Sequence, residues 1–180
     1  WAENLLVYIV NEVLENNSNE LKILDRDISK LSEVKGKFPR LSYTKCIDLL
    51  KDANFDIEWG DDFGSPEETY ISDQYNQPVI VYGFPSKIKA FYMKRDPENS
   101  KVVLGMDILA PEGYGEIVGG SEREVNIDVL LDRIKEEGLK REDYEWFLDL
   151  RKYGSVPHSG FGMGLERVVA WICGLSHIRE

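Results

Sequence analysis

Residues Ser155–Trp171 read SVPHSGFGMGLERVVAW, and this stretch decides both the fold and the candidate site. Three glycines, Gly160, Gly162 and Gly164, alternate with apolar residues, and a helical apolar pattern follows them. Alternation with a period of two is typical of a strand, whereas a period of about 3.6 residues is typical of a helix. The sequence therefore predicts a strand that runs directly into a helix.

The glycines place only hydrogen atoms on one face of this predicted strand, which lets a flat ligand approach the backbone closely. We expect the apolar residues Phe161, Met163 and Leu165 to point the other way, into a core. Arg167 falls one turn into the helix, where a guanidinium can stack on a base or pair with phosphate. We interpret the stretch as a nucleotide site, with close packing of two backbones as the structural alternative.

Two common nucleotide-binding motifs are excluded. The third glycine of a dinucleotide-binding fingerprint would fall at Leu165, and too little sequence follows for the acidic residue that binds the ribose. A phosphate-binding P-loop requires Gly-Lys followed by Ser or Thr, and the sequence contains no such tripeptide. The sequence also offers no credible Ser-His-Asp or Cys-His arrangement for nucleophilic catalysis.

The pattern Gly-x-Gly-x-Gly-x-Glu-Arg at residues 160–167 resembles motif 3 of the class II aminoacyl-tRNA synthetases. Further stretches resemble the catalytic core of the asparaginyl branch of that family: Pro78–Arg95, Met106–Glu124 and Tyr144–Glu180. The opening Trp1–Asn4 resembles the segment that follows motif 2. The resemblance implies an α+β fold with a mainly antiparallel sheet flanked by helices. Residues 1–180 would form part of a class II catalytic domain, with motif 3 at residues 158–174.

The first residue is Trp rather than Met, so we expect the sequence to be part of a longer polypeptide. Motif 1, motif 2 with its arginine, and an anticodon-binding domain are not recognisable in it. Because half of the active site would then be missing, we expect residues 1–180 alone to be inactive.

Composition agrees with one domain of 180 residues that is large enough to bury a core. The net charge of −11 argues against a general nucleic-acid-binding surface. Cys46 and Cys173 lie in apolar helical patterns, which favours buried, reduced thiols over a disulfide or metal site. No long apolar run or leader is visible, so we expect a cytoplasmic protein without a membrane segment.

Periodicity, capping residues and turn residues predict the elements. We expect helices over residues 4–14, 20–31, 42–50, 66–75, 126–137, 142–152 and from 165 to near 174. We expect strands over residues 79–82, 90–93, 102–104 and 114–121. The connections between these strands are too short for crossover helices, so the sheet should be mainly antiparallel.

Two carboxylates form a second candidate group. We expect Asp107 at the end of an apolar strand and Glu116 at the beginning of the next one. Carboxylate oxygens are ligands that Mg²⁺ prefers, and Mg²⁺ bridges nucleotide phosphates. A carboxylate left in solvent at a sheet edge is the structural alternative. The family resemblance implies an ATP- and Mg²⁺-contacting role for Glu116 and a weaker metal role for Asp107.

The resemblance also implies that Arg123 binds the side chain of the amino-acid substrate. Arg123-Glu124 stands where aspartyl enzymes usually continue Arg-Ile-His, and together with Lys152–Gly160 this favours asparagine. Gly119 stands where aspartyl-type sequences often carry serine, so no contact is carried over there. His158 has two open roles: it contacts substrate or phosphate, or it fixes its own loop through a backbone carbonyl.

The resemblance therefore implies an asparagine–tRNA ligase that works with ATP, Mg²⁺, asparagine and tRNA(Asn), as a homodimer at full length. Asparagine would be activated to the adenylate and then transferred to tRNA. The implied ATP-binding residues are Glu116, Gly164, Leu165, Glu166 and Arg167. The alternatives are a synthetase-like ATP-dependent asparagine synthetase, an aspartyl-tRNA synthetase and a non-catalytic synthetase-like module.

Overall fold

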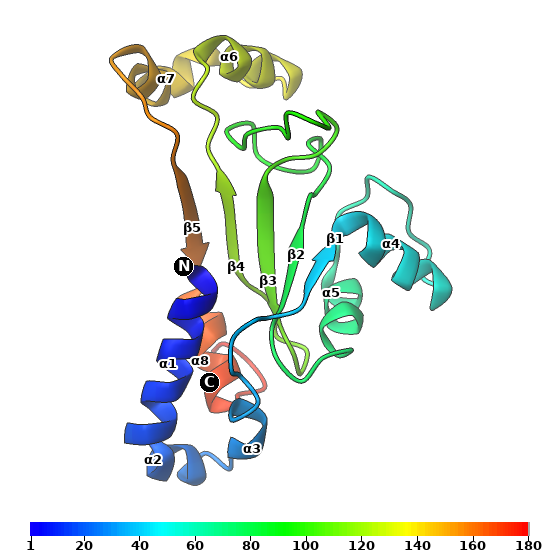
Figure 1. The fold of residues 1–180 in the computed structure, drawn as a ribbon, viewed down its shortest axis with the longest axis vertical. Coiled ribbons are helices and arrows are strands. Elements are labelled where there is room, and N and C mark those ends of the chain that lie inside the picture. The colour runs from blue at the N-terminus through cyan, green and yellow to red at the C-terminus, as the bar shows by residue number, and fades with distance from the viewer. Residues whose placement is uncertain (180) are drawn as a thin grey trace.

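The structure is a computed structural model that describes residues 1–179, with a sheet at its centre and helices around it (Figure 1). Its strands are β1 (Arg40–Ser42), β2 (Val79–Tyr82), β3 (Gly105–Ala110), β4 (Gly115–Glu122) and β5 (Ser159–Met163). Its helices are α1 (Ala2–Asn16), α2 (Ser18–Ile23), α3 (Ile28–Leu31), α4 (Tyr43–Asp52), α5 (Ser65–Ser72), α6 (Ile127–Glu136), α7 (Glu145–Lys152) and α8 (Leu165–Cys173), with a 3₁₀ turn, η1 (Arg141–Tyr144).

The strands of residues 1–179 form one five-stranded sheet in the order β1-β2-β3-β4-β5. The β2–β3, β3–β4 and β4–β5 pairs are antiparallel, whereas β1 and β2 are parallel. This confirms the predicted α+β class with a mainly antiparallel sheet. Strand β1 was not predicted, because three residues are too few to show a strand pattern.

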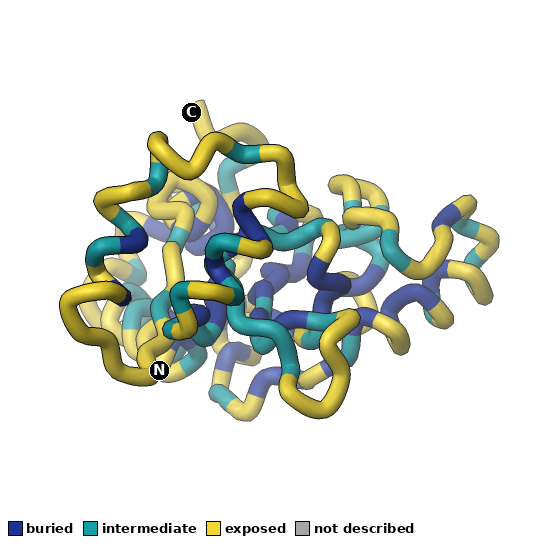
Figure 2. Tube along the Cα trace, turned by 90° about the horizontal axis from the view of Figure 1, so that it is seen from above, coloured by how far each residue is buried: buried dark blue, intermediate teal, exposed yellow. Residues whose placement is uncertain are grey.

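Two apolar clusters cover the two faces of the sheet. One joins α1 and α8 to the sheet residues Ile108, Val118 and their neighbours. The other joins α4 and α5 to Val79, Val81 and Leu109. Seen from above, buried backbone runs through the middle of the molecule and exposed backbone surrounds it (Figure 2). The sheet is therefore the central layer that both helix groups need in order to bury their apolar sides.

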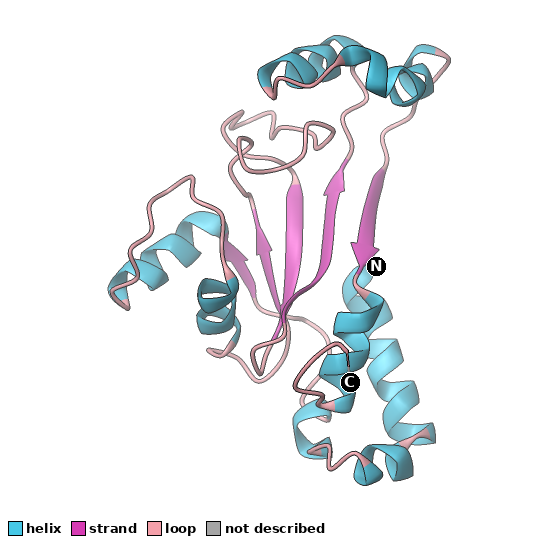
Figure 3. Cartoon of the chain, turned by 180° about the vertical axis from the view of Figure 1, so that it is seen from behind, coloured by secondary structure: helices cyan, strands magenta, loops and turns pink. Residues whose placement is uncertain are grey.

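Helices α6 and α7 lie at the far end of the sheet from α1 and α8 (Figure 3). They bury Leu130, Ile134 and Leu148 against Phe91, which belongs to the long connection between β2 and β3. Two strands predicted in that connection, residues 90–93 and 102–104, are wrong. The connection makes isolated bridges such as Met93 with Arg123, and its residues Phe91 and Val103 are buried without joining a strand ladder.

Local signals placed most of the helices correctly. The Ser42 hydroxyl accepts a hydrogen bond from the Lys45 amide at 3.2 Å and begins α4 as predicted. Gly174 adopts a left-handed φ of 72° and ends α8. The helix predicted over residues 20–31 is instead two short helices, α2 and α3, because Asp25 takes a positive φ of 53° and Asp27 caps a new start.

Two further expectations concern thiols and membranes. Cys46 is buried and Cys173 is half-buried, and both are free thiols, in agreement with the prediction of reduced cysteines. Within residues 1–179, no helix has both the length and the apolar character needed to cross a bilayer.

Candidate functional site

The glycine-rich strand β5 lies at one edge of the sheet, antiparallel to β4. Gly162 pairs with Gly119, and a Cβ placed on Gly162 would meet no other heavy atom of residues 1–179 within 4 Å. Within residues 1–179, no second backbone therefore packs on this glycine. Met163 packs against the core as predicted. Phe161 in β5 and Leu165 at the start of α8 do not, since their exposed fractions are 39% and 63%.

The two carboxylates converge over Gly119 on this same face. A Cβ on Gly119 would lie 2.6 Å from Glu116 Oε1 and 3.3 Å from Asp107 Oδ1. Asp107 pairs with Gly119 from the middle of β3, so the expectation that it ends a strand is wrong. The strand begins at Gly105, after the apolar run that the sequence pattern suggested. The absence of a side chain at Gly119 therefore leaves room for both carboxylates.

Asp107 has a cationic partner within the protein. Its Oδ2 accepts a hydrogen bond from Lys89 Nζ at 2.6 Å, and the Lys89 ammonium also lies 4.0 Å from the centre of the Phe84 ring. Burial raises the pKa of Asp107 to about 6 against the effect of Lys89, and the charges of Glu116 and Glu68 add to the rise. The carboxylates of Asp107, Glu116 and Glu68 together therefore carry more negative charge than Lys89 alone neutralises.

The carboxylates Glu116 and Asp107 supply only part of the ligands that a Mg²⁺ ion needs. Among residues 1–179, no group of three or more His, Cys, Asp or Glu side chains is arranged to hold a metal ion. Mg²⁺ is commonly bound through one or two carboxylates together with substrate phosphates, rather than by a full protein cage. Glu116 and Asp107 meet that smaller requirement, since an oxygen of each carboxylate lies close to the space above Gly119.

The beginning of α8 is anchored to β4. The Gly164 amide donates a hydrogen bond to the Ile117 carbonyl at 3.0 Å, and Arg167 Nη1 donates to the Glu116 carbonyl at 2.9 Å. Arg167 forms no ion pair with an acidic side chain of residues 1–179, so its charge remains available beside the carboxylates. Leu165 and Glu166 are exposed on the same first turn.

Arg123 lies at the other end of the glycine face. Its guanidinium donates to Ser121 Oγ at 2.8 Å and to the Gly160 carbonyl at 3.2 Å, and it lies 4.8 Å from the centre of the Tyr92 ring. No acidic side chain of residues 1–179 pairs with this guanidinium. Its remaining N–H groups are therefore suited to donate hydrogen bonds to an amide or carboxylate oxygen of a ligand.

His158 takes part in fixing its own loop. Its Nδ1 lies 2.8 Å from the Val156 carbonyl, and its own carbonyl accepts a hydrogen bond from the Arg123 amide at 2.9 Å. This geometry matches the loop alternative for His158. Arg123 therefore receives support from the backbone just before the glycine strand.

Sequence reasoning missed Glu68. Glu67 and Glu68 both lie in the first turn of α5, and Glu67 Oε2 accepts a hydrogen bond from the Gly64 amide at 3.0 Å. The Oε2 of Glu68 instead accepts from the Glu116 amide at 3.0 Å. Burial raises the pKa of Glu68, with the Glu116 amide acting against the rise. No local pattern signals this contact, because 48 positions separate the two residues.

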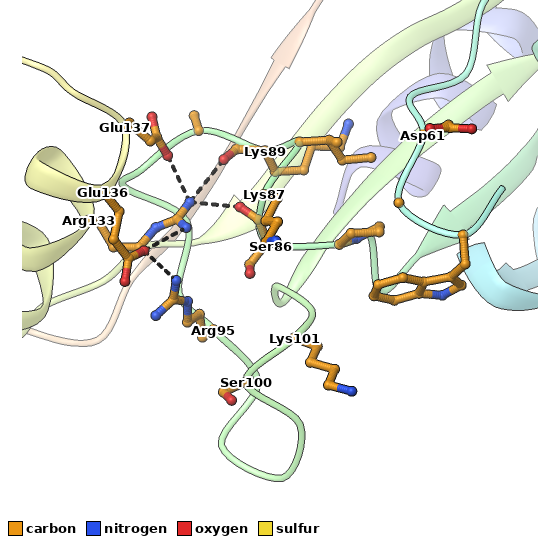
Figure 4. Close-up of a pocket in the computed structure, with 15 residues that line it drawn as sticks. Asp61, Ser86, Lys87, Lys89, Arg95, Ser100, Lys101, Arg133, Glu136 and Glu137 are labelled. Atoms are coloured by element: carbon orange, nitrogen blue, oxygen red, sulfur yellow. Dashed lines mark hydrogen bonds and ion pairs between the residues drawn. The ribbon is translucent and has the colours of Figure 1, made fainter.

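A cavity of about 600 Å³ adjoins this end of the site, and Glu68, Glu116 and Arg167 all line it. A larger cavity of about 1320 Å³ lies between α6 and the β2–β3 connection (Figure 4). There the buried Arg133 donates to the carbonyls of Ser86 and Lys89, at 2.8 and 3.0 Å, and pairs with Glu137. In the larger cavity Arg95 and Arg133 pair with Glu136 and Glu137 (Figure 4), and none of its lining residues belongs to the glycine motif, so we place the candidate site at the glycine face.

Comparison with known sequences decides the family. The profile described as tRNA synthetases class II (D, K and N) matches residues 1–180. The chain belongs to this family. Its relatives include the asparagine–tRNA ligase of Lactobacillus johnsonii, with 59% identity over 179 residues. That match covers 99% of this chain and 41% of the relative, so the chain spans less than half the length of this class II synthetase.

Solved class II synthetases share its fold. The asparaginyl-tRNA synthetase of Pyrococcus horikoshii, in complex with asparaginyl-adenylate, superposes with a TM-score of 0.95 at 52% identity. The superposition covers 99% of this chain and 41% of that one. An aspartyl-tRNA synthetase of Entamoeba histolytica gives a TM-score of 0.85 at 27% identity, over 99% of this chain and 37% of that one. The asparaginyl structure is thus the more similar of the two.

Proposed function

We propose that this chain supplies part of the active site of an asparagine–tRNA ligase. The observation that carries the proposal is its 59% identity, over nearly its full length, to a curated asparagine–tRNA ligase. In the proposed reaction, the carboxylate of asparagine attacks the α-phosphorus of ATP, and pyrophosphate leaves. A hydroxyl of the terminal adenosine of tRNA(Asn) then attacks the carbonyl carbon of the adenylate, and AMP leaves.

The chain's part in the first step would be to bind and orient ATP. The open backbone at Gly162 offers a flat floor. The guanidinium of Arg167, which forms no ion pair within residues 1–179, offers charge to phosphate or a stacking surface to the base. Glu116 and Asp107 would hold Mg²⁺, which when bound neutralises charge on the triphosphate. Catalysis of this kind depends on positioning and charge stabilisation and requires no protein nucleophile.

Arg123 would select and orient the amino acid. Its guanidinium is fixed by Ser121 and Gly160, which leaves it with remaining donors for the side-chain oxygen of the substrate. Asparagine and aspartate both offer such an oxygen, so Arg123 alone does not separate them. The higher similarity to asparaginyl enzymes, 52% against 27% identity, favours asparagine.

Other features of the active enzyme are also proposals. We infer that the chain needs further residues for activity, since it spans 41% of the relative from Lactobacillus johnsonii. The exposed apolar side chains of Phe161, Leu165 and Val169 beside the edge strand β5 support this inference. By the same family resemblance, we propose a cytoplasmic homodimer.

The proposal is tested in a grafted enzyme, in which this chain replaces the matching segment of the Lactobacillus johnsonii ligase. We expect asparagine-dependent exchange of pyrophosphate into ATP without tRNA, and formation of Asn-tRNA when tRNA(Asn) is added. Exchange that depends on aspartate would identify an aspartyl enzyme. Free asparagine made from aspartate and ammonia without tRNA would indicate the synthetase alternative. A folded graft without any exchange would favour the non-catalytic module.

A matched substitution tests the amino-acid site. Replacing Arg123 with Ala should raise the KM for asparagine by about 10- to 100-fold, because a charge-assisted hydrogen bond to the substrate is lost. Arg141 provides the control, since it is exposed and pairs with Glu145 on η1 and α7, away from the glycine face. An unchanged KM in the Arg123→Ala variant would contradict the assignment.

A further inference from the structure

Glu68 reaches the candidate site from a different layer of the fold. It belongs to α5, which covers one face of the sheet, and its Oε2 accepts the hydrogen bond of the Glu116 amide at 3.0 Å. The contact is half-buried and joins residues 48 positions apart. A carboxylate oxygen is a strong acceptor for a backbone N–H, so this bond fixes the first residues of β4 against the helix.

The backbone beside this contact is built to admit the carboxylate. Gly115 has a φ of +67°, and a Cβ at this position would overlap Glu68 Oε2. A side chain at position 115 would therefore push Glu68 away from the Glu116 amide. The glycine permits both the left-handed turn into β4 and the close approach of the carboxylate.

The peptide groups of Glu116 are held from both sides. Its amide donates to Glu68 on α5, and its carbonyl accepts from Arg167 on α8. The three side chains also line one cavity of about 600 Å³. Displacement of the Glu116 backbone would therefore disturb its carboxylate and the support of Arg167 together.

We propose that Glu68 is a positioning residue for ATP, acting by fixing the Glu116 backbone between α5 and α8. The inference rests on the proposed function, because it assigns Glu116 and Arg167 to the ATP site. It assigns no metal-binding or proton-transfer role to Glu68. Its action requires a hydrogen-bond acceptor at the end of the side chain, and a neutral amide oxygen also provides one.

The test compares Glu68→Ala, Glu68→Gln and the control Glu67→Gln in the grafted enzyme. Glu67 is the neighbouring acid on α5, and its carboxylate accepts from the Gly64 amide, away from Glu116. The measurements are the KM for ATP, the KM for asparagine, the melting temperature, and hydrogen exchange of the Glu116 amide by mass spectrometry. The last two measurements do not depend on activity.

Glu68→Ala should raise the KM for ATP by about tenfold or more, because a charged acceptor is lost, while the KM for asparagine changes less than about twofold. Glu68→Gln should restore the KM for ATP to within about threefold of the parent, and Glu67→Gln should not differ from it. Exchange at the Glu116 amide should accelerate in Glu68→Ala and stay slow in the other two variants.

Two results would overturn the inference. One is a Glu68→Ala enzyme with an unchanged KM for ATP. The other is an equal loss for both substrates together with a lower melting temperature, which would indicate a purely structural role. A parent graft without asparagine-dependent exchange would refute the proposed function instead, and the exchange of the Glu116 amide would still decide whether Glu68 holds this backbone.

Discussion

Replacing Gly162 in the glycine strand with Ala should raise the stability of the enzyme and lower its activity. Gly162 lies in β5 without a positive φ, and a Cβ there would meet no heavy atom of residues 1–179 within 4 Å. The Gly162→Ala variant therefore suffers no clash and loses less backbone entropy on folding, which should stabilise it by about 0.4–1 kcal/mol. In the grafted enzyme this corresponds to a rise in melting temperature of about 1–3 °C.

Activity should change in the opposite direction. The methyl carbon would stand about 1.5 Å from the Cα, on the face where Asp107, Glu116 and Arg123 converge. A ligand that touches the bare strand must move away by a similar distance, and a misplacement of about 1 Å costs about 100-fold in rate. Gly162→Val should lose more than Gly162→Ala, because its side chain extends further.

The assay is asparagine-dependent pyrophosphate exchange alongside thermal unfolding. Exchange by Gly162→Ala within about threefold of the parent would refute the placement of the ligand on this face. A clear fall in melting temperature would refute the conclusion that the space above Gly162 is open.

Three further predictions concern the scaffold. Gly174→Ala should destabilise the grafted enzyme by about 1–3 kcal/mol in urea unfolding, because its φ is +72° and the new Cβ would lie 2.7 Å from Arg26 Cδ; unchanged stability would contradict this. Burial raises the pKa of Glu112, but its hydrogen bonds to cations including Arg26 leave the pKa below its usual value. Glu112→Gln should therefore be less stable than the parent at neutral pH, and the difference should shrink as the pH falls below about 4, with a pH-independent difference as the contrary result. Burial raises the pKa of the Cys46 thiol to about 12, so iodoacetamide at pH 8 should label it only after unfolding, as mass spectrometry would show; rapid labelling of the native protein would contradict its burial.

Much of the fold could be predicted because its signals are local. The Ser42 cap, the apolar stripe of α6 and Gly174 each act within a few residues of the element that they define. The apolar runs at residues 90–93 and 102–104 failed as strand predictions. Runs of three or four residues do not distinguish a ladder strand from a buried loop, and burial against α6 and α7 decided the outcome for Phe91.

The residues of the candidate site also fall into those that the sequence predicted and those that depend on tertiary packing. The glycine pattern and Arg167 are contiguous, so sequence alone indicated a nucleotide site, and the family resemblance extended it to Glu116 and Arg123. Neither the glycine pattern nor the family resemblance indicated Glu68, because its contact with Glu116 depends on how α5 packs on the sheet. Lys89 was missed for the same reason, since it lies in the β2–β3 connection and pairs with Asp107 of β3 only once the chain has folded.

The most direct test of the account is asparagine-dependent pyrophosphate exchange by an Arg167→Ala variant of the grafted enzyme. Arg167 is exposed and makes a hydrogen bond with the Glu116 carbonyl, so its removal should leave folding nearly intact. The matched control is Arg141→Ala, which removes an exposed arginine whose ion-pair partner is Glu145 rather than a residue of the candidate site. We predict that exchange falls by about 100-fold or more in Arg167→Ala and stays unchanged in the control. Near-normal exchange by Arg167→Ala would contradict the assignment of this strand and helix as the ATP site.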